Sequence, residues 1–212
     1  MFLRLLAPLV LLLTSGCAIN FDIGPYDIGA DLGDMQGVAP GQCPPDLAGL
    51  GIEDQGDMCR VGVTYEGVFV DGATLTADVD AGIAAAATLV GLVTRVRGGS
   101  LQVDRAQLLG GDGSAPDVVW RDLEISLMID GGTEHLESQP QVPNSTGISF
   151  NAEMSGADLA VVNAVLDAPT TSNLAGTVYL EGSLTLDDIQ VLADSGQLSF
   201  ETGIGADVRV GI

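Results

Sequence analysis

The chain has 212 residues, of which 46% are apolar, and it carries 29 acidic residues against seven arginines and no lysine. This length suits one domain with a substantial core. The formal net charge of −22 excludes nucleic acid as an expected partner, because such a surface repels phosphate backbones. The same surface also repels anionic lipid headgroups.

The first sixteen residues have the pattern of an export signal. Arg4 precedes an apolar run over residues 5–13, and small residues follow as far as Cys17. The run is too short to span a bilayer, which takes about twenty apolar residues. We therefore expect a cleavable signal peptide over residues 1–16.

The end of this segment resembles the lipobox of bacterial lipoproteins, in which a leucine and small residues precede a cysteine that becomes acylated. The residues that carry the resemblance are Leu13, Thr14, Ser15, Gly16 and Cys17. The resemblance implies cleavage before Cys17 and several acyl chains on that residue, which together anchor a protein stably in a bilayer. By the same resemblance, Ala18 in place of an aspartate favours the outer membrane of the cell envelope.

An alternative is ordinary cleavage after Ala18, with Gly16 and Ala18 as the two small residues. The product would then be secreted and soluble.

Two further cysteines, Cys43 and Cys59, form an even pair in an exported chain. We expect a disulfide between them, and closing a loop of about sixteen residues contributes about 3 kcal/mol in the chain-entropy model. A zinc site is less favoured, because the sole histidine, His135, lies far along the chain.

Residues 17–58 are rich in Gly, Asp and Pro, and neither a helical nor a strand period persists through them. This composition predicts an extended tether that leads from lipidated Cys17 to a single mostly-β domain over residues 59–212.

The first part of that domain predicts a hairpin and then a helix. Apolar residues alternate over 61–69, Asp71-Gly72 is a strong turn signal, and 74–79 can return as the second strand. The alanine-rich stretch within 80–96 fits a buried helix.

The middle of the chain has mainly strand periodicity. Alternation predicts a strand over 101–109 with a bulge near Arg105, followed by a glycine-rich turn, and further strands over 123–129 and 148–152. Residues 133–146 are polar and are expected to form a long surface loop.

One helix signal and two strand signals complete the chain. Ser155 and Asp158 have capping-box spacing and predict a short helix. Alternating residues over 174–186 and 197–212 predict two long antiparallel strands. The fold class is therefore mainly β, an antiparallel β-sandwich with one or two short helices; the alternative is an open half-barrel with helices in its mouth.

Recognisable catalytic motifs are absent from the sequence, so we assign no catalytic residue and no cofactor. His135 is expected to be an exposed loop residue, and Trp120 a core aromatic. Asp112 and Asp130 stand beside glycines, where turn chemistry is favoured over a calcium site.

Three functional classes remain open. The favoured one is a non-enzymatic cell-envelope lipoprotein with a structural, adhesive or assembly role through contacts with an envelope protein. A periplasmic carrier of a lipid or other apolar ligand is the alternative, which a continuous internal cavity would favour. An enzyme without a recognisable motif is the least favoured, and acids converging on His135 would support it.

Overall fold

The computed structural model describes residues 18–35, 37–45, 50–86 and 95–211. The elements in these ranges are β1 (Ala18–Asp34), β2 (Leu50–Asp54), β3 (Met58–Asp71), α2 (Gly72–Ala86), β4 (Arg95–Leu109), β5 (Val119–Ile129), β6 (His135–Pro143), β7 (Ile148–Glu153), α3 (Gly156–Asp167), β8 (Asn173–Thr185), α4 (Leu186–Asp194) and β9 (Gln197–Gly211).

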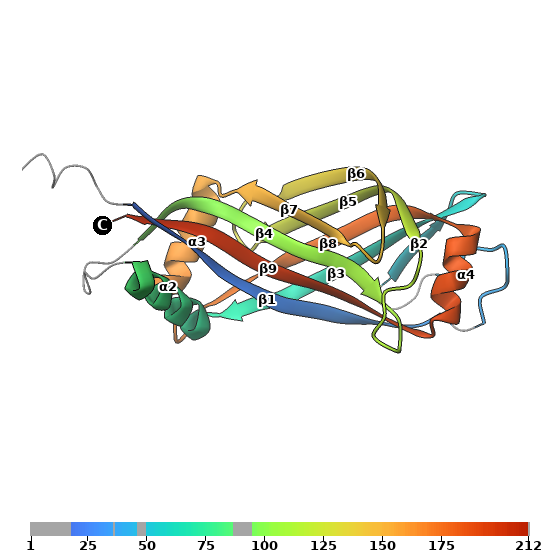
Figure 1. The fold of residues 1–212 in the computed structure, drawn as a ribbon, viewed down its shortest axis with the longest axis horizontal. Helices are drawn as coiled ribbons and strands as arrows, with labels where there is room; N and C mark the ends of the chain where they lie inside the picture. The colour runs from blue at the N-terminus through green and yellow to red at the C-terminus, as the bar shows by residue number, and fades with distance from the viewer. Residues whose placement is uncertain (1–17, 36, 46–49, 87–94, 212) are drawn as a thin grey trace, which may run out of the picture.

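The strands form two antiparallel sheets that pack against each other (Figure 1). One sheet has the order β1-β9-β4-β7 and the other has the order β2-β3-β8-β5-β6. Their inner faces enclose the apolar core, which confirms the predicted mainly-β sandwich. The described residues contain three helices, where one or two were expected.

The predicted tether is wrong over its first half, because residues 18–34 form β1 and belong to the folded body. β1 pairs with β9 from Ala18 to Asp34. Its inward side chains Ile23, Ile28 and Leu32 are buried in the common core. The domain therefore includes Ala18 and does not start at residue 59.

The predicted hairpin at Asp71-Gly72 is also wrong, because β3 runs directly into α2. The Asp71 carboxylate accepts hydrogen bonds from the Thr74 amide at 2.9 Å and from the Thr74 hydroxyl at 2.7 Å. Asp71 thus satisfies a free amide of the first helical turn. Helix α2 ends at Ala86, so it overlaps only part of the predicted helix, whose residues 87–94 lie outside the described ranges.

Helix α2 lies along β1, to which a short hydrogen bond ties it. The Tyr26 hydroxyl donates to the Asp78 carboxylate at 2.5 Å. Burial raises the pKa of Tyr26, and the bond to Asp78 raises it further, so the phenol stays protonated as the donor. Gly82 lets the helix approach closely, since a Cβ atom there would overlap the ring of Phe21.

The predicted bulge near Arg105 is confirmed. The pairing of β4 shifts between Val103 and Ala106 against β7 and between Asp104 and Gln107 against β9. Arg105 has a positive φ of 46°, as the extra residue of a bulge often does.

Residues 135–143 form the edge strand β6 and not a surface loop. β6 pairs with β5 from His135 opposite Leu127 to Pro143 opposite Val119. Only Val142 of this strand is buried, so its inward alternation was too weak to be recognised.

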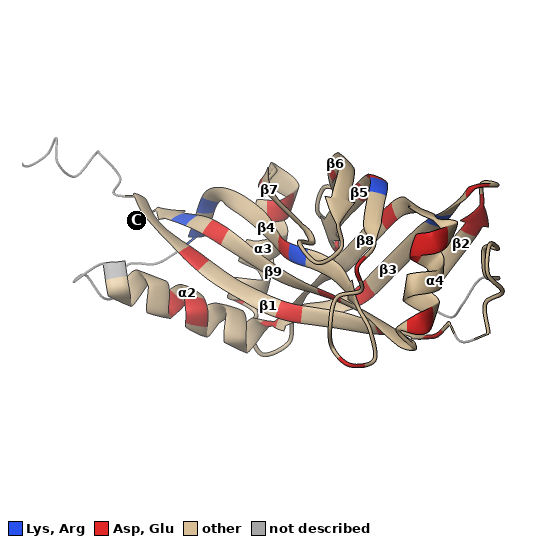
Figure 2. Cartoon of the chain, turned by 45° about the vertical axis from the view of Figure 1, so that its right-hand side comes forward, with Lys and Arg blue, Asp and Glu red and all other residues tan. Residues whose placement is uncertain are grey.

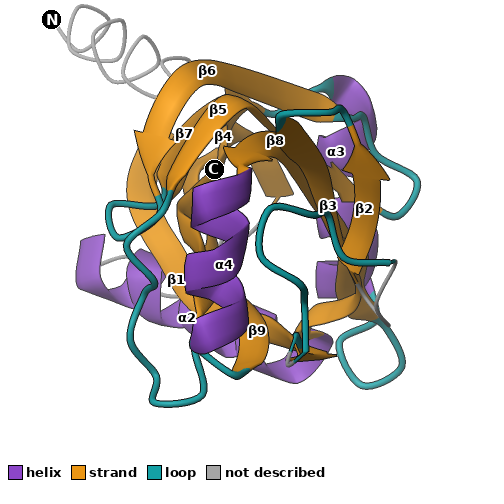
Figure 3. Cartoon of the chain, turned by 90° about the vertical axis from the view of Figure 1, so that its right-hand side faces the viewer, coloured by secondary structure: helices purple, strands orange, loops and turns teal. Residues whose placement is uncertain are grey.

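The two long C-terminal strands exist, but they do not pair with each other. β8 lies in the five-stranded sheet and β9 in the four-stranded sheet, and α4 connects them. Figure 3 shows α4 lying across one end of the sandwich. Thr185 and Asp188 form a capping box at its start.

The predicted helix that starts after Ser155 is confirmed as α3. The Ser155 hydroxyl accepts from the Asp158 amide, and the Asp158 carboxylate accepts from the Ser155 amide at 2.7 Å. In the described part of the chain, no helix is long and apolar enough to cross a membrane.

Candidate functional site

The described part of the chain begins one residue after the predicted lipidation site. β1 starts at Ala18, at the same end of the body as the C-terminal end of β9 (Figure 1). Cys17 and the signal peptide lie outside the described residues, so acylation stays a prediction. If Cys17 carries acyl chains, almost no linker separates the lipid from the sheet.

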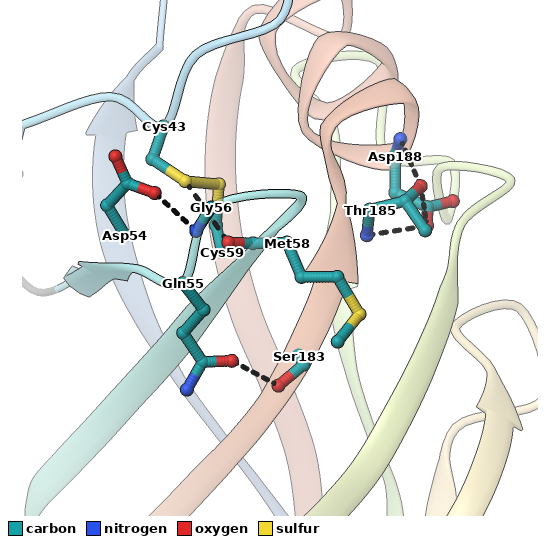
Figure 4. Close-up of a disulfide and its surroundings, with 9 residues drawn as sticks. All are labelled: Cys43, Asp54, Gln55, Gly56, Met58, Cys59, Ser183, Thr185 and Asp188. Carbon is teal, nitrogen blue, oxygen red and sulfur yellow. Dashed lines mark hydrogen bonds between the residues drawn. A yellow bond between two sulfur atoms is a disulfide. The ribbon is translucent and has the colours of Figure 1, made fainter.

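The opposite end of the body holds the disulfide that the sequence predicts. Cys43 and Cys59 are bonded, with their Cα atoms 5.7 Å apart. Cys59 is fully buried in β3 and pairs with Leu184, next to the residue that caps α4. Figure 4 shows the disulfide beside the start of this helix. The bond therefore secures the segment before β2 to the distal end.

The distal end is acidic and exposes part of α4. Asp187 and Asp194 are carried by this helix, while Ile189 and Leu192 are buried beneath it. Val191 is 38% exposed on the same helix. This end combines negative charge with an exposed aliphatic side chain.

His135 is not the exposed loop residue expected from the sequence. Its side chain is 12% exposed, and Nε2 lies 2.9 Å from the Asp158 carboxylate, which is fully buried. Burial alone would raise the pKa of Asp158, but hydrogen bonds from the Thr133 amide, from Ser155 and from His135 lower it overall. Asp158 is therefore an ionised acceptor at neutral pH.

This cluster caps a helix and lacks the geometry of a nucleophilic triad. The Ser155 hydroxyl accepts from the Ala157 and Asp158 amides and shares a hydrogen bond with Thr133. Among the described residues, no hydrogen bond joins Ser155 to His135. A serine nucleophile requires that bond for its activation.

Large apolar side chains of the described residues are buried between the two sheets. Trp120, expected to be a core aromatic, is 1% exposed, and Phe200 is fully buried. An apolar cavity between the four-stranded sheet and helices α2 and α3 has a volume of about 20 Å³. Its lining includes Ile23, Leu75, Leu101, Val162 and Ile204. This volume accommodates about one water molecule and no acyl chain.

A larger hollow of about 550 Å³ is open to solvent on the surface of the four-stranded sheet. Charged side chains gather there, namely those of Asp27, Asp104, Arg105 and Glu201. In the part of the chain that the structure describes, no group of three or more His, Cys, Asp or Glu residues is placed to hold a metal ion. The Asp112 carboxylate instead accepts from the Ser114 amide and hydroxyl within its turn.

Comparisons with protein-family models, with curated proteins and with solved structures gave no significant match.

Proposed function

We propose that this protein is a non-enzymatic lipoprotein of the cell envelope, anchored in the outer membrane through Cys17, with a structural, adhesive or assembly role. The observation that carries the proposal is the start of β1 at Ala18, directly after the lipobox-like cysteine. An anchor at this position holds one end of the elongated sandwich at the membrane surface (Figure 1).

The strand length sets how far the other end reaches. β1 has 17 residues, which span about 55 Å at the usual rise of a strand. The disulfide and α4 lie at that far end. We expect the envelope protein partner to bind there, because the near end faces the bilayer.

The interior supports this class over an apolar carrier. A carrier needs a cavity that encloses its ligand, and the apolar cavity described above holds only about 20 Å³. The capping role of Asp158 likewise explains the acid beside His135 without catalysis.

Cell fractionation of a Cys17→Ser variant tests the anchor. We expect the variant to leave the membrane fraction, because it has no thiol to acylate. Ser15→Ala is the matched control, since it keeps a small residue two positions earlier, and it should stay in the membrane. Unchanged fractionation of Cys17→Ser would contradict the proposal.

A further inference from the structure

Three of the six arginines that follow Cys17 lie at the end of the body where β1 starts. Arg95 and Ala18 both pair with Gly211, and Arg209 pairs with Asn20. Arg97 lies two residues after Arg95 in β4, at a register shift between Val96 and Gly98. We call Arg95, Arg97 and Arg209 the basal arginines.

The basal arginines share the outer face of the four-stranded sheet. Each is exposed and alternates along its strand with buried valines, namely Val96, Val208 and Val210. The glycines beside them provide room for the long side chains.

Two of these side chains pack closely over glycines of the neighbouring strand. That of Arg209 covers Gly98, where a Cβ atom would lie 2.6 Å from its Nη2 atom. Arg97 covers Gly211 so closely that a Cβ atom there would overlap its side chain. Both charges are therefore held at the last residues of the ladder, next to Ala18.

These charges are weakly neutralised by the protein. Arg95 lies 3.7 Å from Asp167, but the two side chains are 73% and 66% exposed, and such pairs contribute little. Arg97 and Arg209 form no ion pair with any carboxylate in the described ranges. Asp207 and Asp22 pair with each other two residues farther from the end and are the nearest acids along β9 and β1. In Figure 2 blue segments lie beside the C-terminus, with red segments of β1 and α2 nearby, whereas red predominates at the α4 end.

We propose that the basal arginines bind the phosphate groups of anionic lipid headgroups in the membrane that anchors Cys17. This inference rests on the proposed function. Guanidinium groups pair with phosphate through two parallel hydrogen bonds. Screening at physiological salt limits the interaction between exposed charges to about 8 Å, so the acids of the α4 end do not cancel the attraction at the basal arginines. Net charge alone suggests repulsion, but the distribution of charge gives attraction at the anchored end.

Residue-resolved arginine labelling tests the contact in the wild-type chain. The acylated protein is reconstituted into vesicles of phosphatidylcholine, or of phosphatidylcholine and phosphatidylglycerol in equal parts, and treated with an arginine-selective dicarbonyl reagent. We expect the anionic vesicles to slow labelling of the basal arginines severalfold and high salt to restore it. Arg105 and Arg121, which lie farther along the body, are internal controls and should react equally in both vesicles.

A charge-matched pair of variants tests the energetics. Arg97→Gln with Arg209→Gln is compared with Arg105→Gln with Arg121→Gln, so both proteins lose two positive charges. Each variant, in detergent, is mixed with both vesicle types, the detergent is removed, and the protein recovered in each vesicle type is measured. We expect the basal variant to lose preference for the anionic vesicles about tenfold more than the control variant, because each arginine near the surface adds to binding.

Equal labelling of the basal arginines in both vesicle types, or equal partitioning of the two variants, would overturn this inference. The mass of the purified protein separates that failure from failure of the proposed function, since it reports acylation directly. If Cys17 carries no acyl chain, the unacylated protein is sedimented with the same vesicles. Binding to the anionic vesicles that the basal substitutions remove would then support the arginine site, and absence of binding would overturn it.

Discussion

The buried side chain of Asn144 links the two sheets near the distal end. Its amide oxygen accepts from the Leu108 amide at 2.9 Å and from the Trp120 indole nitrogen at 3.2 Å. Its amide nitrogen donates to the carbonyl oxygens of Leu108 at 2.9 Å and of Pro116 at 3.3 Å. Asn144 is fully buried, so solvent does not reach these groups.

Substitution of Asn144 by alanine should therefore be strongly destabilising. It leaves the Leu108 amide, the Trp120 indole nitrogen and the Leu108 carbonyl oxygen without this partner, and each unsatisfied buried group costs about 1–3 kcal/mol. The Pro116 carbonyl oxygen still accepts from the Val118 amide at 2.9 Å. Allowing for partial rearrangement, we expect a loss of about 4 kcal/mol in the free energy of unfolding. With a urea slope of about 2 kcal/mol/M, the unfolding midpoint falls by about 2 M.

Urea unfolding followed by Trp120 fluorescence and by circular dichroism measures this loss. Asn151→Ala is the matched control, because Asn151 is exposed on the edge strand β7. Its effect should stay within about 0.5 kcal/mol. A loss below about 1 kcal/mol for Asn144→Ala would refute the view that the buried groups around Asn144 depend on its hydrogen bonds.

Three further predictions concern separate parts of the fold. Replacing both Cys43 and Cys59 by serine should lower the free energy of unfolding by about 3 kcal/mol, and wild-type protein denatured without reductant should show no free thiol between them; thiol labelling there would contradict the disulfide. Because folding lowers the pKa of Asp158, its ionised carboxylate stabilises the fold at neutral pH, and this stabilisation is lost as the pH falls below about 4. Asp158→Asn should flatten the slope of stability against pH in that acidic range, and an unchanged slope would exclude this role. Gly82→Ala should lower Tm by about 4 °C, since the added methyl group collides with Phe21, and an unchanged Tm in calorimetry would show that α2 moves away freely.

Strands with regular alternation and one buried face could be predicted from the sequence. β8 keeps a period of two, and its predicted range of 174–186 agrees with the structure to within one residue at each end. The predicted strand over 123–129 covers the second part of β5, which begins at Val119 and has a register shift between Arg121 and Glu124. The helix after Ser155 was recognised from its capping box. These elements could be predicted because alternation and capping boxes are patterns of residues close together in the sequence.

β1 could not be recognised because two bulges interrupt its period. Its register shifts between Ile23 and Tyr26 and again between Asp31 and Gly33. The buried residues Ile23, Ile28 and Leu32 are consequently not separated by even numbers throughout. Gly and Asp in the same stretch resemble a linker in composition.

The start of α4 could also have been predicted from the sequence. Thr185 and Asp188 have the same capping-box spacing as Ser155 and Asp158, but the alternating pattern of β8 reaches Thr185 and continues with Leu186. Strand periodicity therefore extended the predicted strand into the helix.

The basal arginines could not be grouped from the sequence. Arg97 and Arg209 are separated by most of the domain, and only the register of β4 with β9 brings them to one end. The start of β1 at that same end also depends on this pairing.

The mass of the intact protein, extracted from its own membrane, shows directly whether Cys17 is acylated. We predict a chain that begins at Cys17 and carries additional mass corresponding to several acyl chains. A chain that begins at Ile19 with no added lipid mass would contradict the anchor and indicate a secreted soluble protein.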